Sequence, residues 1–193
     1  MDVRLGWEGL EAALAAGEVC CPDCGEPLRR WGYAREREVR MRHGARVIRP
    51  RRAYCRRCAA THVLLPAFCV PRRRDCVEVI GSALLAAADG VGHRTIAARL
   101  DRPPGTVRGW LRAASRHAEA LRACGVRWAT TLSEPAARSS PWSSPLHATV
   151  DALASAALAW KLRVCDLTNP PWEIAAALTG GGLLNGRPRD PPT

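Results

Sequence analysis

The residues best suited to chemistry are four cysteines in two closely spaced pairs. Two residues separate Cys21 from Cys24, and two separate Cys55 from Cys58. A tight turn inside each pair lets both sulfurs face one ion, and four thiolates complete the tetrahedral site of a structural zinc centre. Gly25 follows the first pair and lets the backbone bend away behind it. We therefore predict that Cys21, Cys24, Cys55 and Cys58 bind one Zn²⁺.

Other interpretations of these cysteines are weaker. Disulfides are disfavoured because nothing at the N-terminus resembles a secretory signal, and cytosolic thiols stay reduced. A thioredoxin-like redox pair would begin a helix after a buried strand, whereas this motif occurs twice beside arginines. Two changes in the ligand set stay open. Cys20 would replace Cys21 only with a three-residue gap to Cys24, and His62 would replace a cysteine of the second pair.

The segment that must position the two pairs alternates as β-strands do. Val39 and Met41 alternate with arginines, His43-Gly44 is typical of a turn, and an extended run returns the chain to the second pair. This is the pattern of a zinc ribbon. Because the segment is too polar to fold by burial alone, we expect bound zinc to supply of order 10 kcal/mol of its folding free energy.

The charge of the chain predicts a polyanionic partner. The 193 residues carry a formal net charge of +11, and Lys161 is the only lysine. Between Arg29 and Arg74 the only acids are Glu36 and Glu38. An arginine bias can reflect genome composition, but a basic stripe on one segment indicates an electrostatic footprint for nucleic acid. The phosphate contacts expected in this segment are Arg49, Arg51, Arg72, Arg73 and Arg74.

Two aromatic residues after the first cysteine pair have two interpretations. Trp31 and Tyr33 could stack on nucleic-acid bases. We favour the alternative, in which they cover the small core beside the metal, because a ribbon has few other apolar groups to bury.

A second module follows, with the pattern of a helix-turn-helix. Asp75 and Glu78 have capping-box spacing before an apolar face that recurs at helical intervals. Two further helices then flank a turn at Asp101, a residue type that tolerates left-handed backbone. Arg102 stands where an apolar residue is commoner, and Pro104 suits the first turn of the second helix.

If that second helix enters a major groove, its outward residues read the DNA. Arg108 is the expected guanine contact, Arg112 lies further along, and Thr106 and Arg102 are expected on phosphates. The alternative is a three-helix bundle without nucleic-acid contact, which the charge and the cysteine pattern disfavour.

The patterns together predict an α+β fold that is mostly α. No apolar run reaches the length of a membrane span, so we expect a cytoplasmic, nucleoid-associated protein with no membrane partner. We interpret Cys69, Cys76, Cys124 and Cys165 as small buried hydrophobes. The predicted segments are an N-terminal helix in 1–19, a zinc ribbon in 20–70, a trihelical helix-turn-helix domain in 71–125, a Ser/Pro-rich linker in 126–145, C-terminal helices in 146–184 and a disordered tail in 185–193.

The chain resembles the N-terminal DNA-binding region of insertion-sequence transposases, and more closely an uncharacterised actinobacterial family of zinc-ribbon and helix-turn-helix proteins. The resemblance covers about residues 20–115. It implies binding to element ends or operators, with a second copy of the chain or a transposase as protein partner. The segments that carry it are Cys21-Pro-Asp-Cys24-Gly25, Arg49-Pro-Arg-Arg-Ala-Tyr-Cys55-Arg-Arg-Cys58, Glu78-Val-Ile-Gly-Ser-Ala-Leu-Leu85, Ile96-Ala-Ala-Arg-Leu100 and Val107-Arg-Gly-Trp-Leu111.

The expected function is therefore non-enzymatic binding of double-stranded DNA, as a transposition accessory factor or a repressor, with Zn²⁺ as cofactor and no small-molecule substrate. One alternative is a transposase or transposase fragment that holds two metal ions with Asp151, Asp166 and Glu173. The segment after Cys124 predicts helices rather than the buried strands that such a site needs. A third hypothesis is an RNA-binding zinc ribbon.

Overall fold

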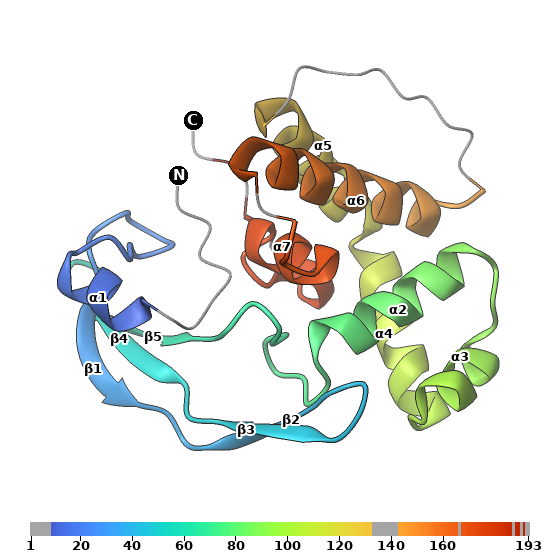
Figure 1. The fold of residues 1–193 in the computed structure, drawn as a ribbon, viewed down its shortest axis with the longest axis horizontal. Coiled ribbons are helices and arrows are strands. Elements are labelled where there is room, and N and C mark those ends of the chain that lie inside the picture. Colours follow the sequence, from blue (N-terminus) through green and yellow to red (C-terminus); the bar gives the residue numbers. More distant parts are fainter. Residues whose placement is uncertain (1–8, 133–142, 166, 187, 190, 192–193) are drawn as a thin grey trace.

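The computed structural model describes residues 9–132, 143–165, 167–186, 188, 189 and 191. Within them the fold is α+β and mostly helical, as predicted (Figure 1). One short helix precedes the strands, and the remaining helices follow them. The elements are α1 (Leu10–Ala15), β1 (Arg29–Tyr33), β2 (Arg37–Arg40), β3 (Ala45–Ile48), β4 (Arg51–Cys55), β5 (Ala60–Leu64), α2 (Val77–Ala88), α3 (His93–Leu100), α4 (Pro104–Arg116), α5 (Ala118–Leu132), α6 (Pro145–Val164), α7 (Pro171–Leu178) and the 3₁₀ helix η1 (Gly182–Leu184).

The strands form two antiparallel sheets rather than one ribbon. β1, β4 and β5 make a three-stranded sheet with β4 in the centre, and β2 pairs with β3 in a second sheet. Arg40 of β2 also forms an isolated parallel bridge with Asp75. β5 lies within the segment 20–70 that the sequence assigns to the ribbon, and it pairs with β4. Figure 1 shows the three-stranded sheet and α1 at one end of the molecule, with α2, α3 and α4 at the other.

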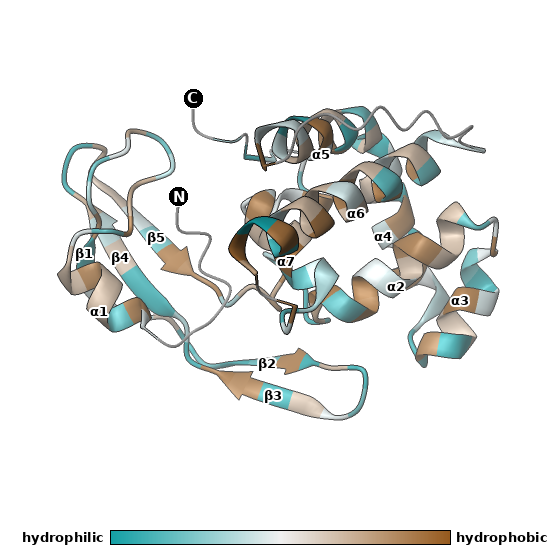
Figure 2. Cartoon of the chain, turned by 45° about the horizontal axis from the view of Figure 1, so that its top comes forward, coloured by the Kyte–Doolittle hydropathy of each residue, from teal (hydrophilic) through white to brown (hydrophobic). Residues whose placement is uncertain are grey.

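The β2–β3 hairpin belongs to the core of the helical module. Gly44 turns the chain with a φ of 73°, as the His43-Gly44 pair predicts. Val39 and Ile48 on its inner face are buried with residues of α2, α3 and α4. Both hairpin strands carry hydrophobic and hydrophilic residues, as alternation requires (Figure 2). The predicted division at residues 70 and 71 thus separates segments that share one core, and the division itself stays a prediction.

The C-terminal helices pack on the helix-turn-helix segment and on one another. Val150 and Leu153 of α6 lie in the same core as α2 and α4. The α5–α6 contact is close, because a Cβ added at Gly125 would lie 2.8 Å from the backbone carbon of Ala152. The C-terminal helices predicted within residues 146–184 are confirmed by α6 and α7.

Two predictions about the second half of the chain need correction. Residues 126–132 of the predicted linker are helical, because Trp128 continues the buried face of α5; residues 133–142 lie outside the described residues. The tail of residues 185–193, predicted to be disordered, is held by hydrogen bonds at Arg189, one of the described residues. The carbonyl of Arg189 accepts hydrogen bonds from Cys124 Sγ at 3.2 Å and from Trp128 Nε1 at 3.1 Å.

Within the part of the chain that the structure describes, no helix has the length and apolar character to cross a lipid bilayer.

Candidate metal centre and nucleic-acid interface

The four predicted cysteine ligands converge at one end of the three-stranded sheet. Their sulfur atoms all lie within 4.8 Å of one another, with Cys21 Sγ 3.9 Å from Cys58 Sγ and Cys24 Sγ 3.5 Å from Cys55 Sγ. A tetrahedral zinc with Zn–S bonds of about 2.3 Å needs sulfurs about 3.8 Å apart. The cluster is therefore consistent with one metal ion of the size and preference of zinc.

Local backbone structure explains why the sulfurs meet. Cys55 ends β4, and its sulfur accepts a hydrogen bond of 3.4 Å from the Cys58 amide within the second knuckle. In the first knuckle, Gly25 adopts a φ of 75° and donates its amide to the Cys21 carbonyl at 2.9 Å. Only a residue without a Cβ takes this conformation freely, as the sequence predicts.

The four neighbouring thiols shift one another's pKa values in opposite directions. The amide of Cys58 lowers the pKa of Cys55 to about 7. The hydrogen bond that Cys58 shares with Cys24, together with burial, raises the pKa of Cys58 to about 12. Neighbouring thiolates repel one another, and a bound dication reverses that repulsion and deprotonates coordinating thiols. The donor set thus fits Zn²⁺, which would be held by Cys21, Cys24, Cys55 and Cys58.

The structure places the two residues of the alternative ligand sets, Cys20 and His62, differently. Cys20 is exposed and points its sulfur toward the Glu18 carbonyl at 3.9 Å, outside the cluster. His62 Nε2 lies 3.5 Å from Cys21 Sγ, so it borders the first cysteine pair rather than replacing a member of the second. His62 comes from β5, which pairs with the strand that carries Cys55.

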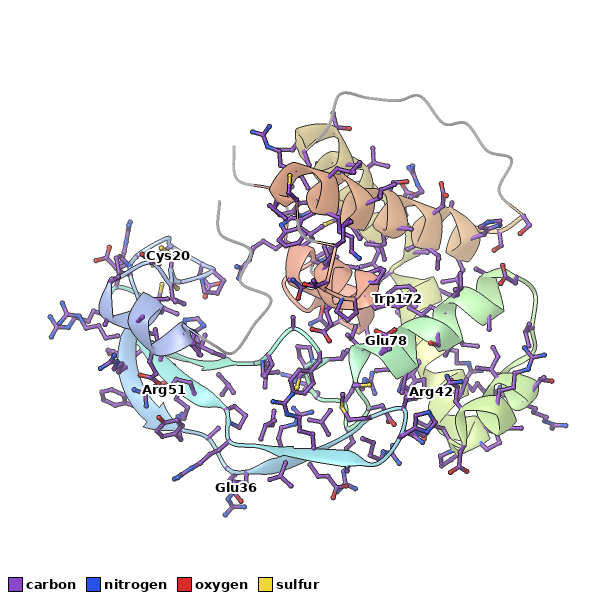
Figure 3. All side chains as sticks on the ribbon, in the orientation of Figure 1. Cys20, Glu36, Arg42, Arg51, Glu78 and Trp172 are labelled. Carbon is purple, nitrogen blue, oxygen red and sulfur yellow. The ribbon has the colours of Figure 1, made fainter. Side chains whose placement is uncertain are left out.

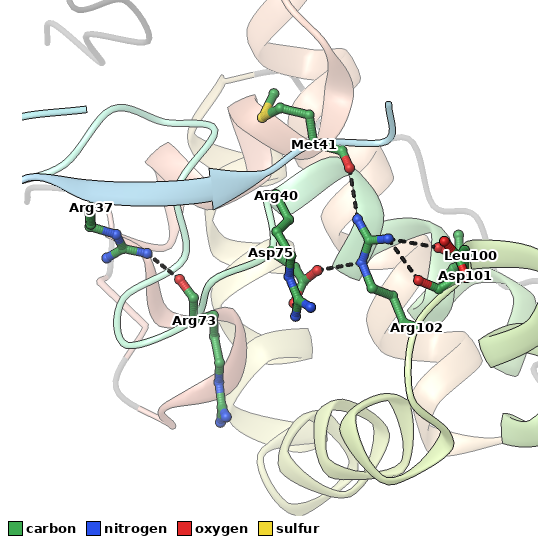
Figure 4. A network of polar contacts seen from close by, with 8 residues as sticks. All are labelled: Arg37, Arg40, Met41, Arg73, Asp75, Leu100, Asp101 and Arg102. Atoms are coloured by element: carbon green, nitrogen blue, oxygen red, sulfur yellow. Dashed lines mark hydrogen bonds and ion pairs between the residues drawn. The ribbon is translucent and has the colours of Figure 1, made fainter. Parts of the chain in front are cut away.

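A buried carboxylate joins the β2–β3 hairpin to the helix-turn-helix (Figure 4). Asp75 is 2% exposed and receives Arg40 Nη2 on Oδ2 and Arg102 Nε on Oδ1, each at 2.6 Å. Arg102 also donates through Nη2 to the Met41 carbonyl at 2.8 Å. Its Nη1 donates to the carbonyls of Leu100 and Asp101. The hairpin is therefore fixed against the turn that precedes α4.

This network corrects two predictions. Arg102 is not available for a phosphate, because its guanidinium is turned inward onto Asp75 and three carbonyls. Asp75 does not cap α2: the helix begins at Val77 with Cys76 as N-cap and no side-chain cap bond. The unexpected arginine in the turn is thus explained by a buried partner rather than by DNA.

The helix-turn-helix geometry agrees with the sequence pattern. Asp101 has a φ of 50°, the left-handed conformation that its residue type predicts for the turn. Val107, Trp110 and Ala114 of α4 are buried, and Pro104 stands in its first turn. The inner face of α4 therefore packs in the core of the helical module.

The outward face of α4 is basic and borders a hollow. Arg108 and Arg112 line a surface depression of about 650 Å³, together with Arg116 and His93 of α3. Arg108, Arg112 and Arg116 are exposed and follow one another at four-residue intervals, so they form one stripe. Thr106 is half-buried near the helix start. The structure thus places Arg108 and Arg112 together, whereas the Arg102 side chain is held by Asp75 and backbone carbonyls.

The arginines of the ribbon that are predicted to contact phosphates also divide into buried and exposed residues. Arg51 is buried, with Nε 2.9 Å from Glu11 Oε1 and Nη1 donating to the Gly32 carbonyl at 3.2 Å. Arg51 is therefore not free to make the phosphate contact predicted from the sequence. The exposed members of the set are Arg49, Arg72 and Arg74, whereas Arg73 is half-buried.

The preferred interpretation of the two aromatic residues is also wrong. Trp31 is 56% exposed and Tyr33 49% exposed. The small core beside the cysteines is filled instead by Leu14 of α1, Leu28 and Ala53. Neither aromatic ring is needed to cover the metal-type cluster.

The acidic residues of the transposase alternative do not form a metal-type group where the structure shows them. Among the described residues, the groups of three or more that could hold an ion are the four cysteines and Cys21 with Asp23 and His62. Asp151 lies in α6 and Glu173 in α7, and Asp166 lies outside the described residues.

Sequence reasoning missed Asp75, Arg40 and Glu11 as organising residues. One signal was present for Asp75, since it is the first acid after Glu38 and directly follows three arginines. A single acid at the end of so basic a stretch is a natural partner for arginine. Nothing in the local pattern indicates that Glu11 neutralises Arg51.

Fold and site together define a mostly helical α+β protein in which a four-cysteine, metal-type cluster is joined to a helix-turn-helix. Residues 21–102 match the family model described as Domain of unknown function (DUF6431). The match begins at the first cysteine of the cluster and ends at the arginine that clamps the hairpin, before α4. No curated protein and no solved structure matches the chain. The resemblance to transposases stays a prediction.

Proposed function

We propose that the chain is a zinc-dependent, sequence-specific DNA-binding protein. The observation that carries the proposal is the outward face of α4. Three exposed arginines at helical spacing and His93 surround a hollow beside a helix-turn-helix, and the opposite face of α4 is committed to the core. Arginine forks suit guanine edges in the major groove, which admits an α-helix. Arg108 lies nearest the helix start, where such helices read bases.

The remaining surface supplies sequence-independent contacts. Arg49, Arg72 and Arg74 are exposed, and none is held by a described ion pair to an acid. Contacts to phosphates fix the position of a protein on the duplex without reading its sequence. Zinc contributes by folding the sheet next to Arg49.

The proposal keeps the association with transposable elements that the sequence resemblance implies, as an accessory factor or a repressor. A second copy of the chain or a transposase is the proposed protein partner. The charge of +11 supports a polyanionic ligand in either role.

The test is selection from random duplex oligonucleotides with zinc-loaded protein, followed by binding measurements over a range of salt. We expect a defined site, and a slope of log K against log salt near −0.9 per phosphate contacted. Arg108→Ala should lose preference at one base pair, worth roughly 1–3 kcal/mol. Arg163→Ala, which removes an exposed arginine from the far end of α6, is the matched control and should leave the selected site unchanged.

A second substitution distinguishes residues that read the base sequence from residues that contact phosphates. Arg74→Ala should weaken all duplexes alike and reduce the salt slope by about one unit, because it removes one phosphate contact. If Arg108→Ala also weakens all sequences equally, or if selection returns no site, α4 is not the reading element.

A further inference from the structure

The outer face of the three-stranded sheet carries an open aromatic surface. The indole of Trp31 stacks on the ring of Tyr54 with centroids 4.9 Å apart and planes at 28°. Tyr54 covers one face of the indole, and Trp31 as a whole remains 56% exposed. Tyr33 is not part of this surface, because it pairs with Arg51, which lies on the buried side of β4 with Ala53. The guanidinium groups of Arg49 and Arg51 lie 5.1 and 4.5 Å from the centre of its ring.

Strand register shows which neighbours share the face with Trp31 and Tyr54. Arg29 is paired with Tyr54 across β1 and β4, so both side chains leave the sheet on the same side. Arg52 is two residues from Tyr54 along β4 and therefore also points outward, opposite Val63 of β5. A stacked aromatic pair is thus flanked by two guanidinium groups.

Folding does not account for this exposure. The small core on the other side of the sheet is complete with Leu14, Leu28 and Ala53, and the cysteine cluster lies at its end. An indole left in water forgoes the free energy of burial that a tryptophan offers. A large exposed aromatic on a rigid sheet instead has the form of a recognition surface.

The charge of the sheet indicates which class of ligand this surface would bind. β1 and β4 each contain two arginines, and none of the strands β1, β4 and β5 contains an acidic residue. Glu11 of α1 pairs with Arg30 and Arg51, which leaves Arg29 and Arg52 to the outer face. The surface is therefore cationic and aromatic, a combination that complements the phosphates and the flat bases of an unpaired nucleic-acid strand.

We propose that the outer face of β1 and β4 is a second binding site, for unpaired bases of single-stranded DNA. Trp31 stacks on a base, and Arg29 and Arg52 contact the flanking phosphates. Bases inside a duplex are already stacked on their neighbours, so this site cannot take them and is distinct from the α4 surface. The choice of DNA over RNA rests on the proposed function of α4.

The test measures binding of labelled oligothymidylate of about 12 nucleotides, within the range that one such module covers, to the full zinc-loaded chain. Trp31→Ala should lower the affinity roughly 5- to 150-fold, the range found for one stacked base. Trp31→Phe, which keeps a stacking ring, should retain most of the affinity. Val47→Ala is the matched control, since Val47 is an exposed apolar side chain 64% accessible on the other sheet, and it should bind as the parent chain does.

The duplex selected by the parent chain makes the outcomes separable. Trp31→Ala should bind that duplex unchanged, and Arg108→Ala should bind oligothymidylate unchanged. If oligothymidylate binding is absent or ignores Trp31 while the duplex site persists, only the second site is refuted. If Trp31-dependent binding persists without a duplex site, the α4 proposal fails instead. Preferential binding of oligouridylate would overturn the assignment to DNA. Bound zinc, measured for every variant, shows that each has folded.

Discussion

Asp75 is the residue on which the relation between hairpin and helices depends. Its buried carboxylate accepts from Arg40 of β2 and from Arg102 of the turn before α4. A buried charge pair contributes little net stability when compared with well-packed apolar residues, but removing one partner leaves the other charges unpaired. The ion pairs of Asp75 therefore act mainly by fixing how the hairpin lies against the helices, rather than by adding net stability.

Asp75→Asn should lower the free energy of unfolding by roughly 3–5 kcal/mol, because two guanidinium groups lose the charge that compensates them. Urea denaturation followed by circular dichroism measures this loss. Glu119→Gln is the control, since Glu119 pairs with Arg122 on the exposed side of α5. That pair lies in solvent, so its loss should change the free energy of unfolding far less than the loss of the Asp75 charge. Equal losses in the two variants would contradict a structural role for Asp75.

At the scale of single residues, the sequence predicts the metal-ligating cysteines better than it predicts the partners of individual arginines. The spacing of two cysteines defines a local turn, so Cys21, Cys24, Cys55 and Cys58 were identified and their convergence is confirmed. An arginine gives no such local signal. Arg102 turns inward because of an acid 27 residues away, which neither motif nor periodicity can show.

Helix α7 is positioned by a glycine of α2. A Cβ built at Gly81 would lie 2.1 Å from Cδ2 of Trp172, so the indole occupies the space that any other residue would fill. Figure 3 shows Trp172 beside α2, close to Glu78. The glycine therefore acts by close approach and not by backbone freedom, since it lies within a regular helix.

Gly81→Ala should displace α7 and destabilise the chain by roughly 1–3 kcal/mol, the usual result of overpacking a core. Gly109→Ala is the matched control. Gly109 lies within α4 and has open space where a Cβ would project, so alanine there should stabilise by roughly 0.5–1 kcal/mol. Thermal unfolding of both variants gives the comparison. Equal shifts of the same sign would show that Trp172 does not occupy that space in solution.

The helices and strands whose own residues show a clear pattern were predicted. Strands that form by pairing with a segment far away in the sequence were not. The helices α6 and α7 have apolar periodicity and begin at a proline, and the prediction of helices in this part of the chain is confirmed. The strands β1 and β5 form by pairing with β4. Each is only five residues long, and β1 begins with two arginines, so neither run gave an adequate local signal. The last turns of α5 were assigned to a linker because Trp128, which buries them, was not recognised as a core residue.

The whole molecule contains separate hydrophobic cores of unequal size. The core beside the cysteines consists of a few residues of α1, β4, β5 and the knuckles, among them Leu14, Leu28 and Ala53. A much larger core joins α2, α3, α4 and α6 with the β2–β3 hairpin. A core as small as the first cannot offset the conformational entropy of its strands without a crosslink or a metal. Stability should therefore depend on zinc in one part of the chain and not in the other.

Removal of zinc by a chelator should unfold the β1–β4–β5 sheet and leave the helices and the hairpin folded. Hydrogen exchange should then show loss of protection at Ala53 and Cys55, whereas Val39 and Ile80 stay protected by the larger core. Cys24→Ser should reproduce this pattern without a chelator, and Cys69→Ser, outside the cluster, should not. In the same preparation, binding to oligothymidylate should disappear, because Trp31 and Tyr54 lose their shared sheet. Duplex binding should weaken but keep the base preference that depends on Arg108. Loss of protection throughout the chain would mean that the two cores unfold together, and no loss anywhere would mean that the cysteines hold no structural metal.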